Sequence, residues 1–102
     1  MEIPKFEFKT EALLIRPDGT TEIIKPLNGD FKLAELYIHL NCNLIEIVRL
    51  RGNVKLPAMV LVVDEEGKFR NNYPNLMATT IMDSRTDYIA GNAIYCWRKL
   101  IK

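Results

Sequence analysis

The stretch from Ala58 to Val63, AMVLVV, is the feature that most restricts how this chain can fold. It is a continuous run of apolar residues, closed on one side by Pro57 and on the other by the polar sequence DEEG. The run has the usual length of a strand, and a strand without polar alternation needs cover on both of its faces. It therefore predicts a central strand of a sheet that is packed on both sides.

Turn residues separate this run from other strand-like segments. Two such segments, about 6–16 and 20–26, flank Pro17-Asp18-Gly19, whose residue types are those of a tight turn, so they predict a hairpin. LIEIVRL (44–50) is rich in strand-forming residues, and DYIAGNAIYCWRKLI (87–101) is expected to be the last strand. Gly91 inside that last segment is typical of a bulge or of a close backbone approach.

One main helix is expected before LIEIVRL. Asp30 is a suitable N-cap, and the apolar side chains after it recur at i, i+3, i+4 and i+7, the spacing of one helix face. These side chains are Leu33, Leu36, Tyr37 and Leu40. Asn41 or Asn43 is expected to end the helix in the left-handed conformation.

The order of these elements predicts an α+β fold. We expect a mostly antiparallel sheet of about five strands, with one main amphipathic helix and a short helical or loop crossover. A chain of 102 residues supports a single domain over residues 1–102. Because one helix would leave one face of the sheet partly uncovered, and LIEIVRL has apolar residues on both faces, self-association as a homo-oligomer is also expected.

Composition excludes several functional classes. The net charge of +1 gives no electrostatic signature of a nucleic-acid-binding protein. No segment approaches the roughly 20 apolar residues of a membrane span. The amino terminus, MEIPKFEFKTE, has acidic residues and no long apolar run, so it is not a secretory signal. Cys42 and Cys96 are expected to be reduced thiols, which suits a cytoplasmic protein.

The sequence offers little for catalysis or metal binding. His39 precedes Cys42 by three residues, a spacing at which a thiolate–imidazole pair could form on a helix, so a hydrolase remains one hypothesis. No glycine-rich turn nearby would supply oxyanion donors, and we expect no enzyme, cofactor or metal. The acidic sequence Asp64-Glu65-Glu66-Gly67-Lys68 is interpreted as a solvated hairpin turn.

NNYPNLMATTIM (71–82) allows two interpretations. Pro74 should turn the chain, and Asn75 should cap a short segment over 76–82. Its apolar residues, Leu76, Met77, Ile81 and Met82, would then face the sheet, and Thr79 and Thr80 would stay near the surface. On the alternative interpretation, amide, aromatic and guanidinium groups line a groove for a polar ligand such as a nucleotide. The candidate ligand-binding residues are Tyr73, Asn75, Thr79, Arg85 and Arg49, with Asn72 in the same groove.

Basic residues supply an alternative function. Arg49, Arg51 and Lys55 surround Gly52, and guanidinium groups suit phosphate oxygens. Trp97, Arg98 and Lys99 combine an aromatic ring with two cations, as single-strand binders do. These residues are also compatible with an ordinary charged surface. A nucleic-acid-associated accessory protein is therefore an alternative, although it is not favoured.

Two motifs carry a resemblance to a known family. VDEEGK followed by PNLMAT, together with the later DYIAG, resembles the domain-of-unknown-function family 3846, over about residues 12–96. The lead MEIPKFEFKT is not part of that pattern. The PN..AT element of the family corresponds to Pro74, Asn75, Ala78 and Thr79, and its glycine to Gly91. The family offers no established catalytic residues.

The resemblance implies a context, because the family occurs largely in phages, prophages and mobile elements. It implies a non-enzymatic accessory binding protein that interferes with a host process, such as a defence system, in the cytoplasm of the bacterial host. One version occludes a host protein with a surface that includes Val48 and Leu50. The other sequesters a nucleotide signal with Tyr73, Asn75 and Arg85, joined by Arg49.

Overall fold

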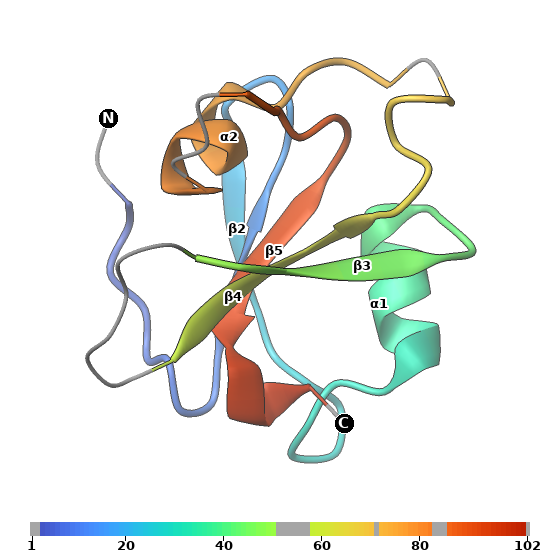
Figure 1. Ribbon diagram of the computed structural model, residues 1–102. Coiled ribbons are helices and arrows are strands. Elements are labelled where there is room, and N and C mark those ends of the chain that lie inside the picture. Colours follow the sequence, from blue (N-terminus) through green and yellow to red (C-terminus); the bar gives the residue numbers. More distant parts are fainter. Residues whose placement is uncertain (1–2, 51–57, 71, 83–85, 102) are drawn as a thin grey trace.

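Five strands form one antiparallel sheet in the computed structural model (Figure 1), which describes residues 3–50, 58–70, 72–82 and 86–101. The order across the sheet is β2-β1-β5-β4-β3, and every neighbouring pair is antiparallel. The predicted α+β fold is confirmed. The strands are β1 (Ala12–Ile15), β2 (Thr21–Ile24), β3 (Ile45–Arg49), β4 (Met59–Asp64) and β5 (Ala93–Trp97), and the helices are α1 (Leu33–Leu40), α2 (Leu76–Met82) and the 3₁₀ helix η1 (Arg98–Leu100).

Strand β4 contains most of the apolar run AMVLVV (58–63). It lies between β3 and β5, and all six of its residues are buried. Val60 and Val62 belong to the apolar cluster on the α1 side of the sheet, whereas Leu61 and Val63 belong to the cluster on the α2 side. The prediction of an interior strand covered on both faces is therefore confirmed, although β5 occupies the middle position.

Helix α1 covers the first face of the sheet through Leu36 and Leu40, which are both buried. The predicted N-cap at Asp30 is wrong, because the helix begins after Lys32. Instead, the Glu35 carboxylate accepts hydrogen bonds from the N–H groups of Lys32 and Leu27, each at 2.9 Å. These two bonds, with that from Lys32 the stronger influence, lower the pKa of Glu35.

The other end of α1 agrees with the sequence. Asn41 ends the helix with φ of 52°, in the left-handed conformation that asparagine tolerates. The predicted apolar stripe is only partly right, because Leu33 is exposed and the buried face is narrower.

The second face of the sheet is covered by two segments. Ala78 and Met82 of α2 pack in the same cluster as Leu61 and Val63 of β4. The lead segment (residues 3–11) brings Phe6 edge-on to Tyr95, with ring centroids 5.9 Å apart, and Phe8 edge-on to Trp97 at 5.4 Å. This face nevertheless remains partly uncovered, because Ile23 of β2, which lies beside Leu13 on the same face, is 46% exposed. Self-association as a homo-oligomer stays a prediction. α1 and α2 lie on opposite sides of the sheet (Figure 1).

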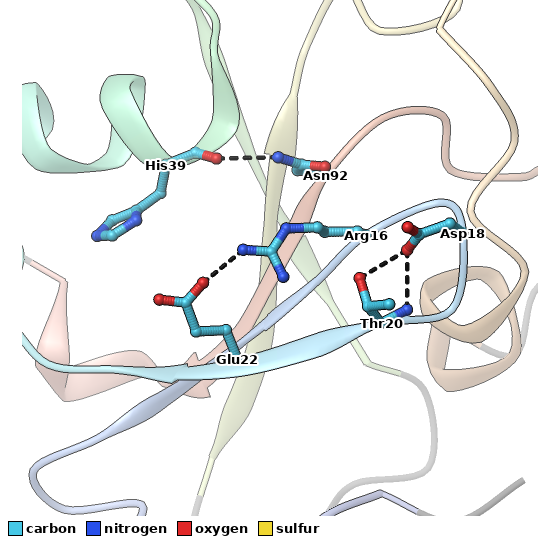
Figure 2. A network of polar contacts seen from close by, with 6 residues as sticks. All are labelled: Arg16, Asp18, Thr20, Glu22, His39 and Asn92. Carbon is cyan, nitrogen blue, oxygen red and sulfur yellow. Dashed lines mark hydrogen bonds and ion pairs between the residues drawn. The ribbon is translucent and has the colours of Figure 1, made fainter.

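The first hairpin turns where the sequence predicts, although its strands are shorter than the predicted runs. Asp18 Oδ1 accepts hydrogen bonds from the N–H and the hydroxyl of Thr20, at 2.9 and 2.6 Å, and these bonds lower the pKa of Asp18. Gly19 follows with φ of 89°. Figure 2 shows this turn and the ion pair between Arg16 and Glu22 that joins the two strands. These contacts all lie within residues 16–22 and are therefore local in sequence.

Asn92 connects this sheet to α1. Its side-chain Nδ2 donates a 3.1 Å hydrogen bond to the backbone carbonyl of His39, as Figure 2 shows. The predicted last strand is shorter than 87–101, because β5 begins only at Ala93 and η1 follows it. Gly91 lies just before the strand, with φ of 88° and the Asn72 side chain close to it. The expected close approach is therefore present, but outside the strand.

Candidate functional site

Asn75 joins three parts of the fold at the end of the sheet where β4 finishes. Its side chain is fully buried, and Nδ2 donates to the carbonyl of Ile15, at the end of β1, at 3.0 Å and to that of Gly91 at 2.8 Å. Oδ1 accepts the N–H of Ala78 at 3.1 Å, which caps α2 as predicted. Because every polar atom of this side chain is engaged inside the protein, Asn75 has a structural role and offers no surface to a ligand.

Thr79 continues this interior hydrogen bonding. Its hydroxyl donates to the carbonyl of Asn75 at 2.7 Å and accepts the N–H of Ile89 at 2.9 Å. Backbone bonds join the same two segments, from Asn75 N to Ile89 O at 2.7 Å and from Gly91 N to Tyr73 O at 2.9 Å. The polar residues of PNLMATT are therefore accounted for by folding, as the first interpretation of NNYPNLMATTIM held.

The remaining predicted site residues do not gather around Asn75. Tyr73 is exposed close to it, but Arg49 is paired with Val60 near the beginning of β4, at the other end of that strand. Arg85, like Arg51 and Lys55 of the basic cluster, lies outside the described residues. Ligand binding by Tyr73, Thr79, Arg85 and Arg49 stays a prediction.

A hollow of about 280 Å³ opens beside the Asn75 connections. It lies between the ends of β3 and β4, the turn that follows β4, the end of α2 and residues 87–90. We call it the acidic hollow, because three exposed carboxylates stand at its edge. The apolar lining is formed by Val48, Val63, Met82 and Ile89, and the exposed charged residues are Glu46, Glu65, Lys68 and Asp87.

The turn that forms one wall of the hollow differs from its prediction. Residues 65–70 form consecutive turns, in which the N–H of Arg70 bonds to the carbonyl of Glu66 at 3.1 Å, and β4 does not fold back as one arm of a hairpin with the next segment. Gly67 is buried, and a Cβ there would lie 2.5 Å from the carbonyl oxygen of Ala90. The prediction of a solvated hairpin turn over residues 64–68 is therefore wrong, because the backbone at Gly67 packs directly against Ala90 in the segment before β5.

Lys68 shows how the edge of the hollow holds a cation. Its ammonium lies 4.6 Å from the centre of the Tyr88 ring and forms an ion pair with Asp87. Asp87 also accepts the N–H of Tyr88 at 2.8 Å. The hydrogen bond from Lys68, followed by that from Tyr88, lowers the pKa of Asp87. An aromatic face and a carboxylate thus act together on one positive charge.

Four large apolar side chains are exposed around the hollow and the neighbouring segment. They are Phe69, Tyr73, Leu76 and Tyr88, with exposed fractions of 90%, 80%, 69% and 45%. Phe69 and Tyr88 line the hollow, and the bridge between Pro74 and Ala90 sets the segment with Tyr73 and Leu76 alongside that with Tyr88. We call these four residues the aromatic patch.

The exposure of Leu76 corrects the predicted orientation of α2. The prediction turned Leu76 toward the sheet, but Ala78 is the residue of this helix that is fully buried there. Met82, one turn later, is buried as predicted.

The cysteines lie in the interior. Burial, with a contribution from the nearby Asp64 carboxylate, raises the pKa of Cys42, and burial raises the pKa of Cys96 to about 12. A raised pKa keeps a thiol protonated at neutral pH, which is unfavourable for a nucleophile. Among the residues that the structure describes, no group of three or more histidine, cysteine, aspartate and glutamate side chains is arranged to hold a metal. Nor is any described helix long and apolar enough to span a membrane.

The comparison with protein families gives one match, over residues 9–99, to the family described as Domain of unknown function (DUF3846). The chain belongs to this family. The resemblance found in VDEEGK, PNLMAT and DYIAG is thereby confirmed. Neither the curated proteins nor the solved structures contain a significant match. Phe6 and Phe8, which cover the second face of the sheet, lie before the region that matches the family.

Sequence reasoning missed the acidic hollow. Lys68 and Asp87 are 19 positions apart, and neither belongs to a motif with recognised chemistry. The sequence contains only a weak indication of the hollow. DEEGKF and DYIA each combine acidic and aromatic residues next to an apolar run. The two sequences meet in the fold, where Gly67 packs on Ala90 next to the antiparallel contact between 72–76 and 88–91.

Proposed function

We propose that this protein is a non-enzymatic binding protein that acts by covering a surface of a protein partner with its aromatic patch. The exposure of Phe69 and Tyr88 in the lining of one hollow, and of Tyr73 and Leu76 on the neighbouring segment, supports this proposal. Single exposed apolar residues are common in soluble proteins, but several gathered around a concave site are characteristic of interaction surfaces.

The charge of the acidic hollow favours protein occlusion over nucleotide sequestration. Glu46, Glu65 and Asp87 repel phosphate groups, and Lys68, the one cation among the described residues of the lining, is already paired with Asp87. The same charges disfavour a nucleic-acid-binding role at this surface. We therefore propose a protein contact at the patch and the acidic hollow, in which Tyr73 takes part, in place of a nucleotide groove formed with Asn75 and Arg85.

The family resemblance supplies the proposed context. A phage or prophage accessory protein that binds a host protein stoichiometrically would block that protein without turnover. We propose that the partner belongs to a host process such as a defence system, in the cytoplasm of the bacterial host. This part of the proposal rests on the family alone.

Affinity capture from extracts of a bacterial host tests the role of the patch. We expect the wild-type chain to retain a host protein in equimolar amount and Phe69→Ser to lose it, because the substitution removes the most exposed aromatic ring of the patch. Leu27→Ser is the matched control, since Leu27 is also a highly exposed apolar residue, at 80%, but lies between β2 and α1, outside the patch.

Three results would contradict this proposal. One is a captured protein that binds Phe69→Ser as well as it binds wild type. Another is a small-molecule mass that native mass spectrometry finds on the purified chain and loses on denaturation. The last is a dimer, detected by sedimentation, that Phe69→Ser dissociates, because the patch would then be covered by a second copy of the chain.

A further inference from the structure

We propose that the acidic hollow receives a cationic side chain, arginine or lysine, from the partner, and that this residue lies within an apolar segment of that partner. This inference rests on the proposed function and adds the chemistry of the group that the hollow selects. Three properties of the site carry it: its charge, the composition of its lining, and the contacts that the protein's own Lys68 makes at its edge.

The charge of the hollow is not neutralised by the residues that the structure describes. Lys68 pairs with Asp87, which leaves Glu46 of β3 and Glu65 of the following turn as two exposed carboxylates at the same opening. Neither has an ion pair among the described residues. Two uncompensated negative charges at one concavity attract a positive group and repel an anionic one.

The lining suits the rest of a long basic side chain. Val63, Met82 and Ile89 are buried residues with apolar side chains that border the hollow. Lysine and arginine side chains cover apolar surfaces with their methylene stems while the charged group stays near water. In the acidic hollow, the stem would contact these three residues, and the charged group would remain level with the carboxylates of Glu46 and Glu65.

Lys68 supplies an internal example of the recognition we infer. Its ammonium is held by the ring face of Tyr88 and the carboxylate of Asp87. Phe69, the next residue, keeps its ring almost fully exposed at the same opening and has no comparable cation among the described residues. A second cation placed between Phe69 and the free carboxylates would gain both kinds of contact, because aromatic faces attract cations.

The wall formed by residues 65–70 is held in place before any partner binds. Gly67 packs so closely on the Ala90 carbonyl that no side chain fits between them, and Asp64 Oδ1 accepts the N–H of Glu66 at 2.9 Å. A preformed site loses less conformational entropy on binding than a site that must first become ordered.

Titration with a short peptide, followed by the backbone N–H signals in NMR spectra, tests the inference. The probe is acetyl-Leu-Arg-Leu-Gly-amide, and its control is the same peptide with citrulline, which keeps the shape of arginine but has no charge. We expect the arginine peptide to shift the signals of Val63, Lys68 and Ile89. The citrulline peptide should bind with an affinity that is lower by a factor of about five.

Charge-neutralising variants locate the effect. The double variant Glu46→Gln with Glu65→Gln should weaken binding of the arginine peptide about fivefold, because each exposed ion pair contributes modestly. Glu66→Gln is the matched control: Glu66 is exposed on the same turn but does not line the hollow, so binding should change by less than about twofold.

Equal binding of the arginine and citrulline peptides would overturn the inference, and so would shifts confined to another part of the protein. Its failure differs from failure of the proposed function. Loss of the captured partner with Phe69→Ser but not with Glu46→Gln and Glu65→Gln would keep the aromatic patch and reject the cationic side chain. Peptide binding together with capture that Phe69→Ser does not affect would reject the proposed function instead.

Discussion

The side chain of Asn75 connects the end of β1, the segment before β5 and the start of α2. Replacing it by alanine leaves the carbonyls of Ile15 and Gly91 and the N–H of Ala78 without their partners in a buried place. We expect Asn75→Ala to lower the free energy of unfolding by about 2–4 kcal/mol, measured by urea denaturation.

A matched change at the surface controls for the loss of an asparagine. Asn43 is exposed, and Asn43→Ala should change the free energy of unfolding by less than about 0.5 kcal/mol. Equal stability of Asn75→Ala and Asn43→Ala would show that the buried hydrogen bonds of Asn75 make no net contribution.

Sequence reasoning reached part of this role of Asn75. The succession Pro74-Asn75 predicts a cap, because the proline ends the preceding extended segment and the amide can accept a nearby N–H. The bonds to Ile15 and Gly91 join positions 60 and 16 residues away, and no local pattern specifies such partners. The sequence alone therefore does not distinguish an asparagine whose side chain is fully hydrogen-bonded inside the protein from one that binds a ligand.

Cys96 gives a pH-dependent prediction at the same scale. Burial raises its pKa to about 12 in the folded protein, whereas in the unfolded chain the pKa is near the ordinary thiol value of 9.0. Below pH 9 the thiol is protonated in both states, so its contribution to stability is fully present. Between pH 9 and 12 only the unfolded chain ionises, and stability falls.

Urea unfolding midpoints measured between pH 8 and 10.5 test the role of Cys96. We expect the wild-type midpoint to decline above pH 9 and that of Cys96→Ala to decline less. The half-buried Tyr95, whose pKa is also raised by burial, contributes to the decline in both proteins, so the difference between their slopes is the informative quantity. Parallel slopes would contradict the assignment to Cys96.

At the scale of elements, the lead segment acts as a cover for β5. Phe6 contacts Tyr95, which packs on the second face of the sheet, and Phe8 contacts Trp97 at the end of the strand. We expect the double variant Phe6→Ser with Phe8→Ser to lose about 1–3 kcal/mol of stability, because two aromatic contacts and their apolar cover are removed.

The same double variant should also self-associate, because it leaves apolar surface on the sheet uncovered. Sedimentation velocity measures this, and Lys5→Ser with Lys9→Ser controls for substitution in the same segment without loss of the rings. A double phenylalanine variant that sediments like wild type would mean that other segments cover this face.

The orientation of α2 shows where periodicity fails at this scale. A helix of seven residues completes only two turns, so the spacing of Leu76, Met77, Ile81 and Met82 does not select one face. The contacts of Asn75 and Thr79 fix the start of the helix instead. They turn the small Ala78 inward and leave Leu76 exposed.

At the scale of the whole molecule, the small net charge gives no indication of the negative charge concentrated at the acidic hollow. The net charge of +1 gives no basic nucleic-acid footprint. It also concealed Glu46, Glu65 and Asp87, which are far apart in sequence and meet only at the acidic hollow. The sheet was predictable because apolar runs and turn residues specify strands locally. The hollow was not, because it depends on how distant turns pack.

The central position of β5 has a consequence for how the chain assembles during synthesis. β1 pairs with β2 and β3 pairs with β4, but only β5 joins these two pairs. Since β5 is the last strand to leave the ribosome, the two earlier pairs must wait with their inner edges open. The nascent protein therefore cannot close its sheet until Ala93–Trp97 has been made, and chaperones have that interval in which to bind it.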